Sequence, residues 1–233
     1  MKARILDHGY IEFIESWGHG KEQCEDMERG IIEAARQSTQ GSFRGWEEDA
    51  KLLSYLFESK PQHSTPFEFS GMTIEVQAPI FVFREWQRHR TQSYNEMSAR
   101  YAPLPDLNYI PTTERMLLGG GHLTRQASGV EGAQVLTQRV AELYQDSLQD
   151  YYDSAERLYQ YALGKGVPKE LARIVLPVGR YSRMRASANL RNWLAFLTLR
   201  TDEKAQWEIR QFANAVGELI SQKFPQTYRL FRK

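Results

Sequence analysis

The sequence predicts an α+β fold: a single domain, residues 1–233, in which a small central antiparallel sheet is flanked by helices, one of them long. Two segments alternate apolar and polar residues with the period of two that a half-buried strand requires, whereas most other segments show helical spacing. The expected helices and strands do not follow one another in the regular order that surrounds a parallel sheet, and this favours an α+β fold. A length of 233 residues suits one large domain, and a hydrophobic fraction of 41% is enough to form its core.

Two amphipathic helices are expected first, over 22–36 and 46–59. The second helix would place four large apolar residues on one side, namely Leu52, Leu53, Leu56 and Phe57. The Ser64-Thr65-Pro66 segment then interrupts the helical pattern, and a threonine before a proline is by itself an ordinary turn residue.

The first strand is predicted over 71–78. Its apolar face would carry Met72, Ile74, Val76 and Ala78, and its polar face Thr73, Glu75 and Gln77. Pro79 suits the first turn of a following helix, which would deliver a basic cluster at its C-terminal end, near residues 84–90. Positive side chains are favourable at that end of the helix dipole.

Residues 102–132 are rich in Pro, Gly, Asn and Thr, with Gly119-Gly120-Gly121 at the centre, and predict a long loop. A long helix is expected over 132–163 and a short one over 168–175. The long helix would have one apolar face, made of Leu136, Val140, Leu143, Ser147, Tyr151, Ala155, Leu158 and Ala162. Its tyrosines at 144, 151, 152 and 159 are most simply packing between helices or subunits.

The second alternating segment spans 183–190. Met184, Ala186, Ala188 and Leu190 would form its apolar face, and Arg183, Arg185, Ser187 and Asn189 its polar face. That polar face is either the solvent side of the sheet or a ligand-binding surface, and the pattern alone leaves both open. Helices over 191–200 and 206–223 complete the chain.

The charge pattern favours a small anionic ligand. A net charge of +1 argues against a protein that coats nucleic acid. Arginine nevertheless outnumbers lysine by 21 to 9, and six arginines lie between residues 171 and 201 without an acidic neighbour. The single cysteine, Cys24, excludes an intramolecular disulfide and favours a reducing compartment. With no signal-like N-terminal segment and no apolar run of about 20 residues, a cytoplasmic location is expected.

The segment 88–101, RHRTQSYNEMSARY, is the most informative in the chain, because it concentrates arginines, hydroxyls, an amide and a carboxylate without an apolar stripe. Arginine binds phosphate and carboxylate through two parallel hydrogen bonds. The five histidines are scattered, so no metal site is predicted, and GxSxG, GxGxxG and Walker motifs are absent. Acidic neighbours of Cys24 blunt its reactivity. What remains is ligand binding by arginines, amides and hydroxyls, and sites of this kind can hold a flavin and a nucleotide.

These residues resemble the signature of the flavin-dependent thymidylate synthases: Arg88-His89-Arg90, seven further residues, then Ser98. The resemblance extends to 63–69, 78–90, 170–177, 189–191 and 196–209, and is weakest over 115–132. It implies reductive methylation of dUMP to dTMP, with 5,10-methylenetetrahydrofolate as carbon donor, NADPH-reduced FAD as hydride source and no cysteine nucleophile. It also implies a homotetramer with active sites at subunit contacts, and no nucleic-acid or membrane partner.

The resemblance also implies roles for individual residues. The residues that would bind dUMP are Glu85, Trp86, Gln87, Arg88, Glu96, Met97, Ser98, Ala99, Arg100, Arg173 and Arg200, and Arg200 would be catalytic by polarising the uracil near N3. The residues that would bind FAD are Thr65, Arg88, His89, Arg90, Glu96, Asn189 and Arg191, with His89 also helping to position folate. The chain departs from relatives in having Ala195 in place of a polar FAD contact, and Glu85 where some members have glutamine.

Other interpretations remain beside this one. Trp86 suits the core better than a ligand contact, and Arg183 and Arg185 suit surface ion pairs. Ser98 lacks an activating base and is expected to donate a hydrogen bond, with a nucleophilic role as the lesser alternative. A single-strand nucleic-acid module could instead stack bases on Tyr94, Tyr101 and Tyr181. A flavoprotein that has lost methyl transfer is the third option.

Overall fold

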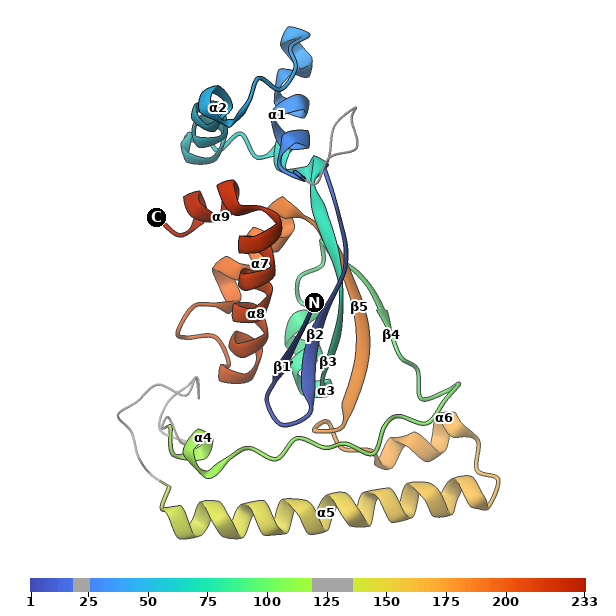
Figure 1. Cartoon of the computed structure of the whole chain (residues 1–233). Coiled ribbons are helices and arrows are strands. Elements are labelled where there is room, and N and C mark those ends of the chain that lie inside the picture. The colour runs from blue at the N-terminus through green and yellow to red at the C-terminus, as the bar shows by residue number, and fades with distance from the viewer. Residues whose placement is uncertain (19–25, 119–135) are drawn as a thin grey trace.

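The computed structural model describes residues 1–18, 26–118 and 136–233. Its centre is a five-stranded antiparallel sheet in the order β1-β2-β3-β5-β4 (Figure 1). The strands are β1 (Lys2–Ile5), β2 (Gly9–Trp17), β3 (Gly71–Pro79), β4 (Ser93–Glu96) and β5 (Tyr181–Asn189). The predicted α+β fold with a central antiparallel sheet is therefore confirmed.

The two predicted strands form the middle of the sheet. β3 and β5 pair along their full lengths, with Ile74 opposite Ala186 and Val76 opposite Met184. These four side chains are buried, whereas Arg183 and Arg185 on the other face are exposed, as the alternation predicted. β5 begins two residues earlier than expected, and Leu190 belongs to the next helix.

Three strands were not predicted. β2 reads GYIEFIESW, in which charged residues obscure the alternation even though Ile11 is buried. β1 and β4 are four residues each, too short for a periodic signal, and β4 carries the polar sequence SYNE. Their pairing with β2 and β5 therefore depends on neighbouring strands rather than on local pattern.

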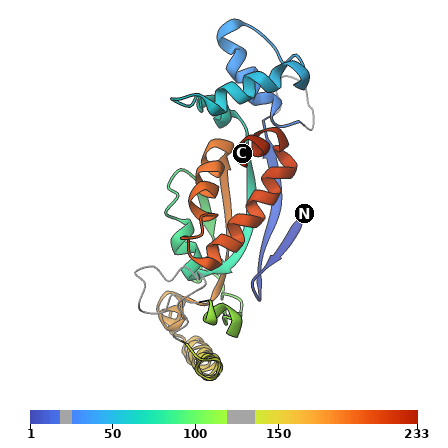
Figure 2. The same ribbon diagram turned by 90° about the vertical axis from the view of Figure 1, so that its left-hand side faces the viewer.

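One face of the sheet is covered by helices α3 (Ile80–Trp86), α7 (Leu190–Arg200), α8 (Trp207–Lys223) and α9 (Pro225–Phe231), as Figures 1 and 2 show. The core between them contains large aromatic side chains: Trp86 stacks on Phe196 with ring centroids 4.7 Å apart, and Phe212 packs edge-on against Trp86. The helices predicted over 191–200 and 206–223 are confirmed.

Helix α3 differs from its prediction at both ends. Pro79 is the last residue of β3 and precedes the first helical residue, instead of lying in the first turn. The helix ends at Trp86. The basic segment that follows therefore forms turns after the helix and does not belong to the last helical turn. The end is set by tertiary contacts, since the hydroxyl of Tyr94 donates to the backbone carbonyls of Trp86 (3.1 Å) and His89 (2.8 Å).

The two ends of the sheet carry separate groups of helices (Figure 1). At one end lie α1 (Arg29–Arg36), α2 (Trp46–Glu58) and the short 3-10 helix η2 (Thr65–Phe69). The helix predicted over 46–59 is confirmed. That predicted over 22–36 begins at Arg29 among the described residues; positions 22–25, including Cys24, lie outside them.

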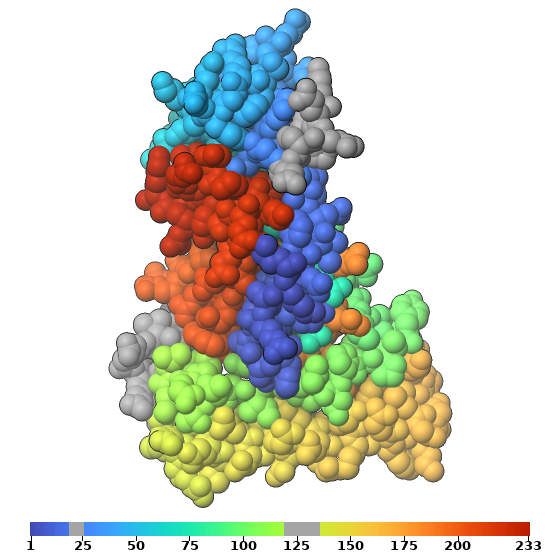
Figure 3. Space-filling view, viewed as in Figure 1, coloured from blue at the N-terminus to red at the C-terminus, as the bar shows by residue number. Residues whose placement is uncertain are grey.

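At the other end, the 27-residue helix α5 (Gln138–Gly164) lies across the strand ends, beside α4 (Thr113–Leu117), α6 (Lys169–Ala172) and the 3-10 turn η3 (Arg173–Val175) (Figures 1 and 3). The predicted loop over 102–132 contains α4, and its glycine centre lies outside the described residues, as do 132–135 of the predicted long helix. In the described part of the chain, no helix has the length and hydropathy to cross a bilayer.

Of the apolar residues expected along one face of α5, Ala155 is buried, but the large side chains are exposed. Leu143 and Leu158 are 46% and 52% exposed, and Tyr151 and Val140 are also exposed. The buried face consists of Ala141, Tyr152, Ala155 and Tyr159. The helix therefore has two apolar stripes, one packed against the rest of the chain and one turned outward.

Candidate functional site

The site is built around the junction of β3 and α3. Strand β3 is buried at the centre of the sheet, and α3 anchors itself in the core through Val82, Phe83 and Trp86. Because a helix turns 100° per residue, Arg84 and Glu85 between these anchors, and Gln87 directly after the last one, project away from this core in different directions. A short, firmly anchored helix thus presents polar side chains at defined positions.

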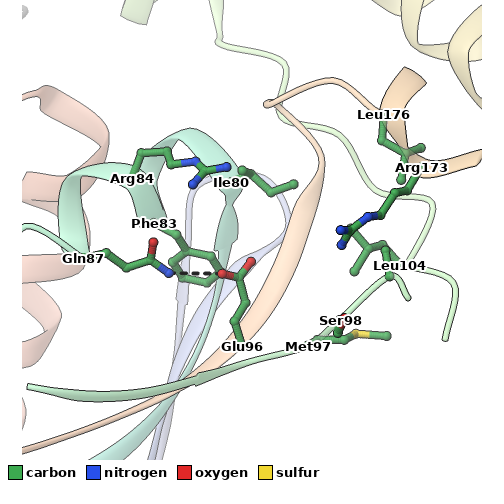
Figure 4. A pocket seen from close by; sticks show the side chains of 11 residues that line it. Ile80, Phe83, Arg84, Gln87, Glu96, Met97, Ser98, Leu104, Arg173 and Leu176 are labelled. Carbon is green, nitrogen blue, oxygen red and sulfur yellow. Dashed lines mark hydrogen bonds between the residues drawn. The ribbon is translucent and has the colours of Figure 1, made fainter. Parts of the chain in front are cut away.

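A cavity of about 350 Å³ lies between α3, the segment after β4 and η3 (Figure 4). Its lining residues are Ile80, Phe83, Arg84, Gln87, Glu96, Met97, Ser98, Ala99, Leu104, Arg173 and Leu176. This volume lies within the range of small-molecule sites. The structure therefore brings six of the residues expected to bind dUMP into one cavity: Gln87, Glu96, Met97, Ser98, Ala99 and Arg173.

Polar groups inside this cavity are held in place. The amide Nε2 of Gln87 donates to Glu96 Oε2 at 3.1 Å, which joins α3 to the end of β4 (Figure 4). The backbone N–H of Met97 donates to the carbonyl of Arg183 at 2.7 Å, so the segment 97–99 starts from the edge of the sheet. Ser98 Oγ accepts from the backbone N–H of Arg100 at 3.3 Å.

Two guanidinium groups enter the cavity from opposite sides, Arg84 from α3 and Arg173 from η3 (Figure 4). Neither has an ion-pair partner among the described residues, and Glu96 is the single carboxylate in the cavity lining. Arginines in structural roles elsewhere in the chain are paired, as Arg115 is with Glu208. The imbalance of charge suits an anionic ligand.

A second group lies on another side of α3 and contains Glu85, His89 and Arg200. Arg200 Nη1 donates to Glu85 Oε2 at 2.8 Å, Nη2 to the Glu85 carbonyl at 2.9 Å, and Nε to His89 Nε2 at 2.8 Å. Burial and the neighbouring Arg200 charge lower the pKa of His89 to about 4, with Glu85 opposing. The predicted catalytic residue is thus already held by two other predicted residues.

A third group lies around η2 and the start of α7. Arg191 forms an ion pair with Glu68 and lines a cavity of about 390 Å³ together with Ala195 and Leu194. The side-chain oxygen of Asn189 accepts from the Asn192 backbone N–H at 3.0 Å and so caps α7. Thr65, at the start of η2, lines a neighbouring cavity of about 250 Å³.

Four predicted residues lie outside these groups. The side chain of Trp86 is fully buried, and its indole N–H donates to Gln92, so it supports the site from the core and lines no cavity. Arg88 and Arg90 are exposed and have no ion-pair partner within the described ranges. Arg100 points to Glu170, 3.6 Å away, and does not line the cavity.

Arg84 is the polar residue that sequence reasoning missed, since it was noted as basic but assigned no role. A signal was available: Ile80, Arg84 and Gln87 are spaced i, i+4 and i+7, so a helix places them on one face. Leu104 and Leu176 complete the cavity from irregular segments and carried no such signal.

Taken together, an α+β fold with a cavity that two arginines line has the features of a protein with a site for a small anionic ligand. The model of the family described as "Thymidylate synthase complementing protein" matches residues 21–226. The flavin-dependent thymidylate synthase of Thermotoga neapolitana is 35% identical over 233 residues, which cover all of this chain and 95% of that protein. The enzyme of the same name from Thermus thermophilus is 35% identical over 98% of this chain and 77% of that protein.

Solved structures agree. The UMP/dUMP methylase PolB from Streptomyces cacaoi, bound with 5-Br dUMP, superposes with a TM-score of 0.82 and 30% identity, over 99% of this chain and 97% of that one. A second structure of PolB, bound with 5-Br UMP, gives a TM-score of 0.80 and 31% identity. The chain belongs to the family of flavin-dependent thymidylate synthases.

Proposed function

We propose that this protein methylates dUMP to dTMP as a flavin-dependent thymidylate synthase. The observation that carries the proposal is the 350 Å³ cavity, in which Arg84 and Arg173 face each other without counter-ions among the described residues. A nucleoside monophosphate offers the anionic phosphate group that two guanidiniums bind through paired hydrogen bonds. The names of the relatives and the nucleotide analogues bound to PolB support the same ligand class.

In this proposal, the phosphate of dUMP is bound by Arg173, Arg84, the hydroxyl of Ser98 and the backbone N–H groups of Ser98 and Ala99, since that of Met97 is already bonded to Arg183. Gln87 and Glu96, already joined to each other, orient the rest of the nucleotide. Arg100 joins them by leaving Glu170. That exchange is easy because both side chains are more than half exposed, and an exposed ion pair contributes at most about 1 kcal/mol.

Arg200 is proposed to act on the uracil ring. A fixed positive charge beside N3 stabilises negative charge that develops on the ring, and thereby makes C5 nucleophilic. The contacts with Glu85 and His89 orient the guanidinium in advance. Because this activation needs no thiolate, Cys24 is proposed to be dispensable, and Cys24→Ser should retain turnover.

The cofactor is proposed to be FAD, held by Thr65, His89, Arg191 and Asn189, with Arg88, Arg90 and Glu96 beside it. The residues present fit such a group: Arg88 and Arg90 are exposed and have no counter-ion in the described ranges, and the cavity beside Arg191 has apolar walls that suit a ring system. When bound, FAD reduced by NADPH supplies the hydride, and 5,10-methylenetetrahydrofolate supplies the carbon.

A homotetramer with shared sites is proposed because one chain holds the expected residues in separate groups. Gln87 and Arg173 line the cavity, whereas Glu85 and Arg200 lie together on another side of α3. The outward stripe of α5 offers apolar area for association, with Leu143, Tyr151 and Leu158 about half exposed. A second copy would bring the two groups to a single nucleotide.

The decisive measurement is tritium release from 5-labelled dUMP, with and without methylenetetrahydrofolate, by protein whose flavin absorbance bleaches with NADPH. Release that requires the folate supports the synthase, and Arg173→Ala should reduce it strongly at subsaturating dUMP while the surface control Arg44→Ala should not. Flavin bleaching without release would identify a flavoprotein that lacks methyl transfer. Colourless protein that shifts an oligonucleotide with a steep salt dependence would overturn the proposal.

A further inference from the structure

The contact between Arg200 and His89 fixes where the imidazole carries its proton. The Nε atom of an arginine always bears a hydrogen, because the guanidinium does not lose its proton in proteins. Arg200 Nε lies 2.8 Å from His89 Nε2 in hydrogen-bonding geometry. Nε2 must therefore be the acceptor, which requires that it carry no proton and that the ring be neutral with its proton on Nδ1.

The guanidinium is held so that this contact is maintained. Its two terminal nitrogens donate to the carboxylate and the backbone carbonyl of Glu85, at 2.8 and 2.9 Å. Arg200 is the last residue of α7 and Glu85 lies in α3, so two packed helices set the geometry. A rotation that released His89 would break all three hydrogen bonds.

The ring itself is also held. Phe196 packs edge-on against it with centroids 4.9 Å apart, and the hydroxyl of Tyr94 in β4 binds the His89 carbonyl at 2.8 Å. The charged groups that face the ring are Arg200 from α7 and Glu85 from α3, of opposite sign. Burial and Arg200 lower the pKa of His89 to about 4, so the neutral form is expected at pH 7.

The other ring nitrogen remains available. Within the part of the chain that the structure describes, Nδ1 of His89 has no hydrogen-bond partner, and it is not among the enclosed polar atoms. The His89 side chain is thus bonded at Nε2 and has no described partner at Nδ1, although the residue as a whole is only 9% exposed.

We propose that Glu85 and Arg200 act as positioning residues that fix His89 as the neutral Nδ1–H tautomer, whose one N–H is offered to an acceptor atom of the bound flavin. The acceptor's identity rests on the proposed function, but the tautomer does not. Arg200 and His89 then have separate tasks: Arg200 carries the positive charge of the site, and His89 is an uncharged hydrogen-bond donor.

The tautomer can be tested without cofactor or turnover. In protein labelled with ¹⁵N-histidine, long-range ¹H–¹⁵N correlation spectra at pH 7 distinguish the Nδ1–H, Nε2–H and doubly protonated forms of each ring, and His89→Asn identifies the His89 signals. We expect the Nδ1–H pattern for His89. An Nε2–H pattern for His89, or titration with a pKa above 6, would overturn the proposal.

Variants separate positioning from folding. Arg200→Gln should raise the pKa of His89, although burial still holds it below its ordinary value, and should populate both tautomers. The conservative Glu85→Gln, which keeps an acceptor, should retain the Nδ1–H form and lower the His89 pKa further, because it removes a negative charge. An unchanged His89 spectrum in Arg200→Gln, with thermal unfolding as in the wild type, would refute Arg200's role.

The donor can be tested by a matched pair of substitutions. The asparagine amide in His89→Asn reaches the place of Nδ1, and that of His89→Gln reaches the place of Nε2. Flavin affinity, followed by its visible absorbance, should fall at least tenfold more in His89→Gln than in His89→Asn. The reverse order would exclude Nδ1 as the donor; if wild-type protein binds no flavin, the proposed function fails while the tautomer result stands.

Discussion

The guanidinium of Arg180, the residue that precedes strand β5, lies 2.9 Å from the carboxylate of Glu156 and so joins the start of this strand to the long helix α5 by a largely buried ion pair. Its side chain is 2% exposed, and the same nitrogen is 2.6 Å from Asp106 in the loop before α4. Three segments that are distant in the sequence meet at this one cation. It lies in the segment after η3 that also contributes Leu176 to the cavity. The end of the sheet that carries α5 therefore depends on it.

Replacing Arg180 should destabilise the fold. Arg180→Met keeps most of the side-chain volume but leaves Glu156 largely buried without its partner, which typically costs about 3–5 kcal/mol. Urea unfolding measures the loss. The exposed neighbour Arg157→Met should change stability by less than about 0.5 kcal/mol. Equal stability of the two variants would contradict a structural role for the ion pair.

Arg84 and Arg173 should contribute to nucleotide binding. Loss of one hydrogen-bonded charge, at about 1.5–3 kcal/mol, corresponds to a rise of roughly 10- to 100-fold in the Kd for dUMP in Arg84→Gln or Arg173→Gln. Isothermal titration at two salt concentrations measures it, and Arg157→Gln is the control. If Arg84→Gln binds dUMP with the wild-type constant, Arg84 does not belong to the site.

Arg200→Ala should retain flavin and lose turnover. Removing a preorganised charge that stabilises the transition state typically lowers kcat by about 10²–10³. Tritium release and flavin absorbance, measured on the same sample, separate the two effects, and the exposed Lys204→Ala serves as the control. Full activity in Arg200→Ala would refute its assigned role.

Stability should depend on pH through Glu28. Its carboxylate is fully buried at the start of α9, where it accepts from the backbone N–H groups of Gln226 (2.8 Å) and Thr227 (2.5 Å). Burial raises the pKa of Glu28 from its ordinary 4.5 to about 6, with the hydrogen bonds opposing. The folded state thus binds the proton more tightly than the unfolded chain does. The resulting stabilisation is complete below pH 4.5 and is lost as the pH rises through 6.

The free energy of unfolding of the wild type, minus that of Glu28→Gln, should therefore fall by about 1–2 kcal/mol between pH 4.5 and 7. Urea unfolding of both proteins at the two pH values gives this difference. A difference that grows with pH would show that the hydrogen bonds outweigh burial.

The outward stripe of α5 should carry association. Leu143→Glu combined with Leu158→Glu places two charges on it and should reduce the oligomer measured by light scattering, while α5 remains helical. Gln138→Glu, which adds charge elsewhere on the same helix, should not change the mass. Unaltered assembly in the double variant would remove this stripe from the interface.

Sequence reasoning succeeded where the signal was local. The alternation of β3 and β5 gave the centre of the sheet, and the contiguous segment 88–101 gave the family. It failed where contacts with other segments decide the structure. β4 consists of four polar residues, which form a strand because β5 pairs with them. Helix α5 has two apolar stripes, and the sequence does not tell which of them faces inward. The hydrogen bond between Arg200 and His89 joins residues 111 positions apart, beyond any pattern in the chain.

Helix α3 directs Arg84 and Gln87 to one group and Glu85 to the other, and this has a genetic consequence. If each site takes one group from each of two copies, an allele damaged at Arg173 and another damaged at Arg200 are each inactive alone. Co-expressed in a thymidine-requiring cell, their mixed assemblies would contain some sites with no damaged residue, and growth would return.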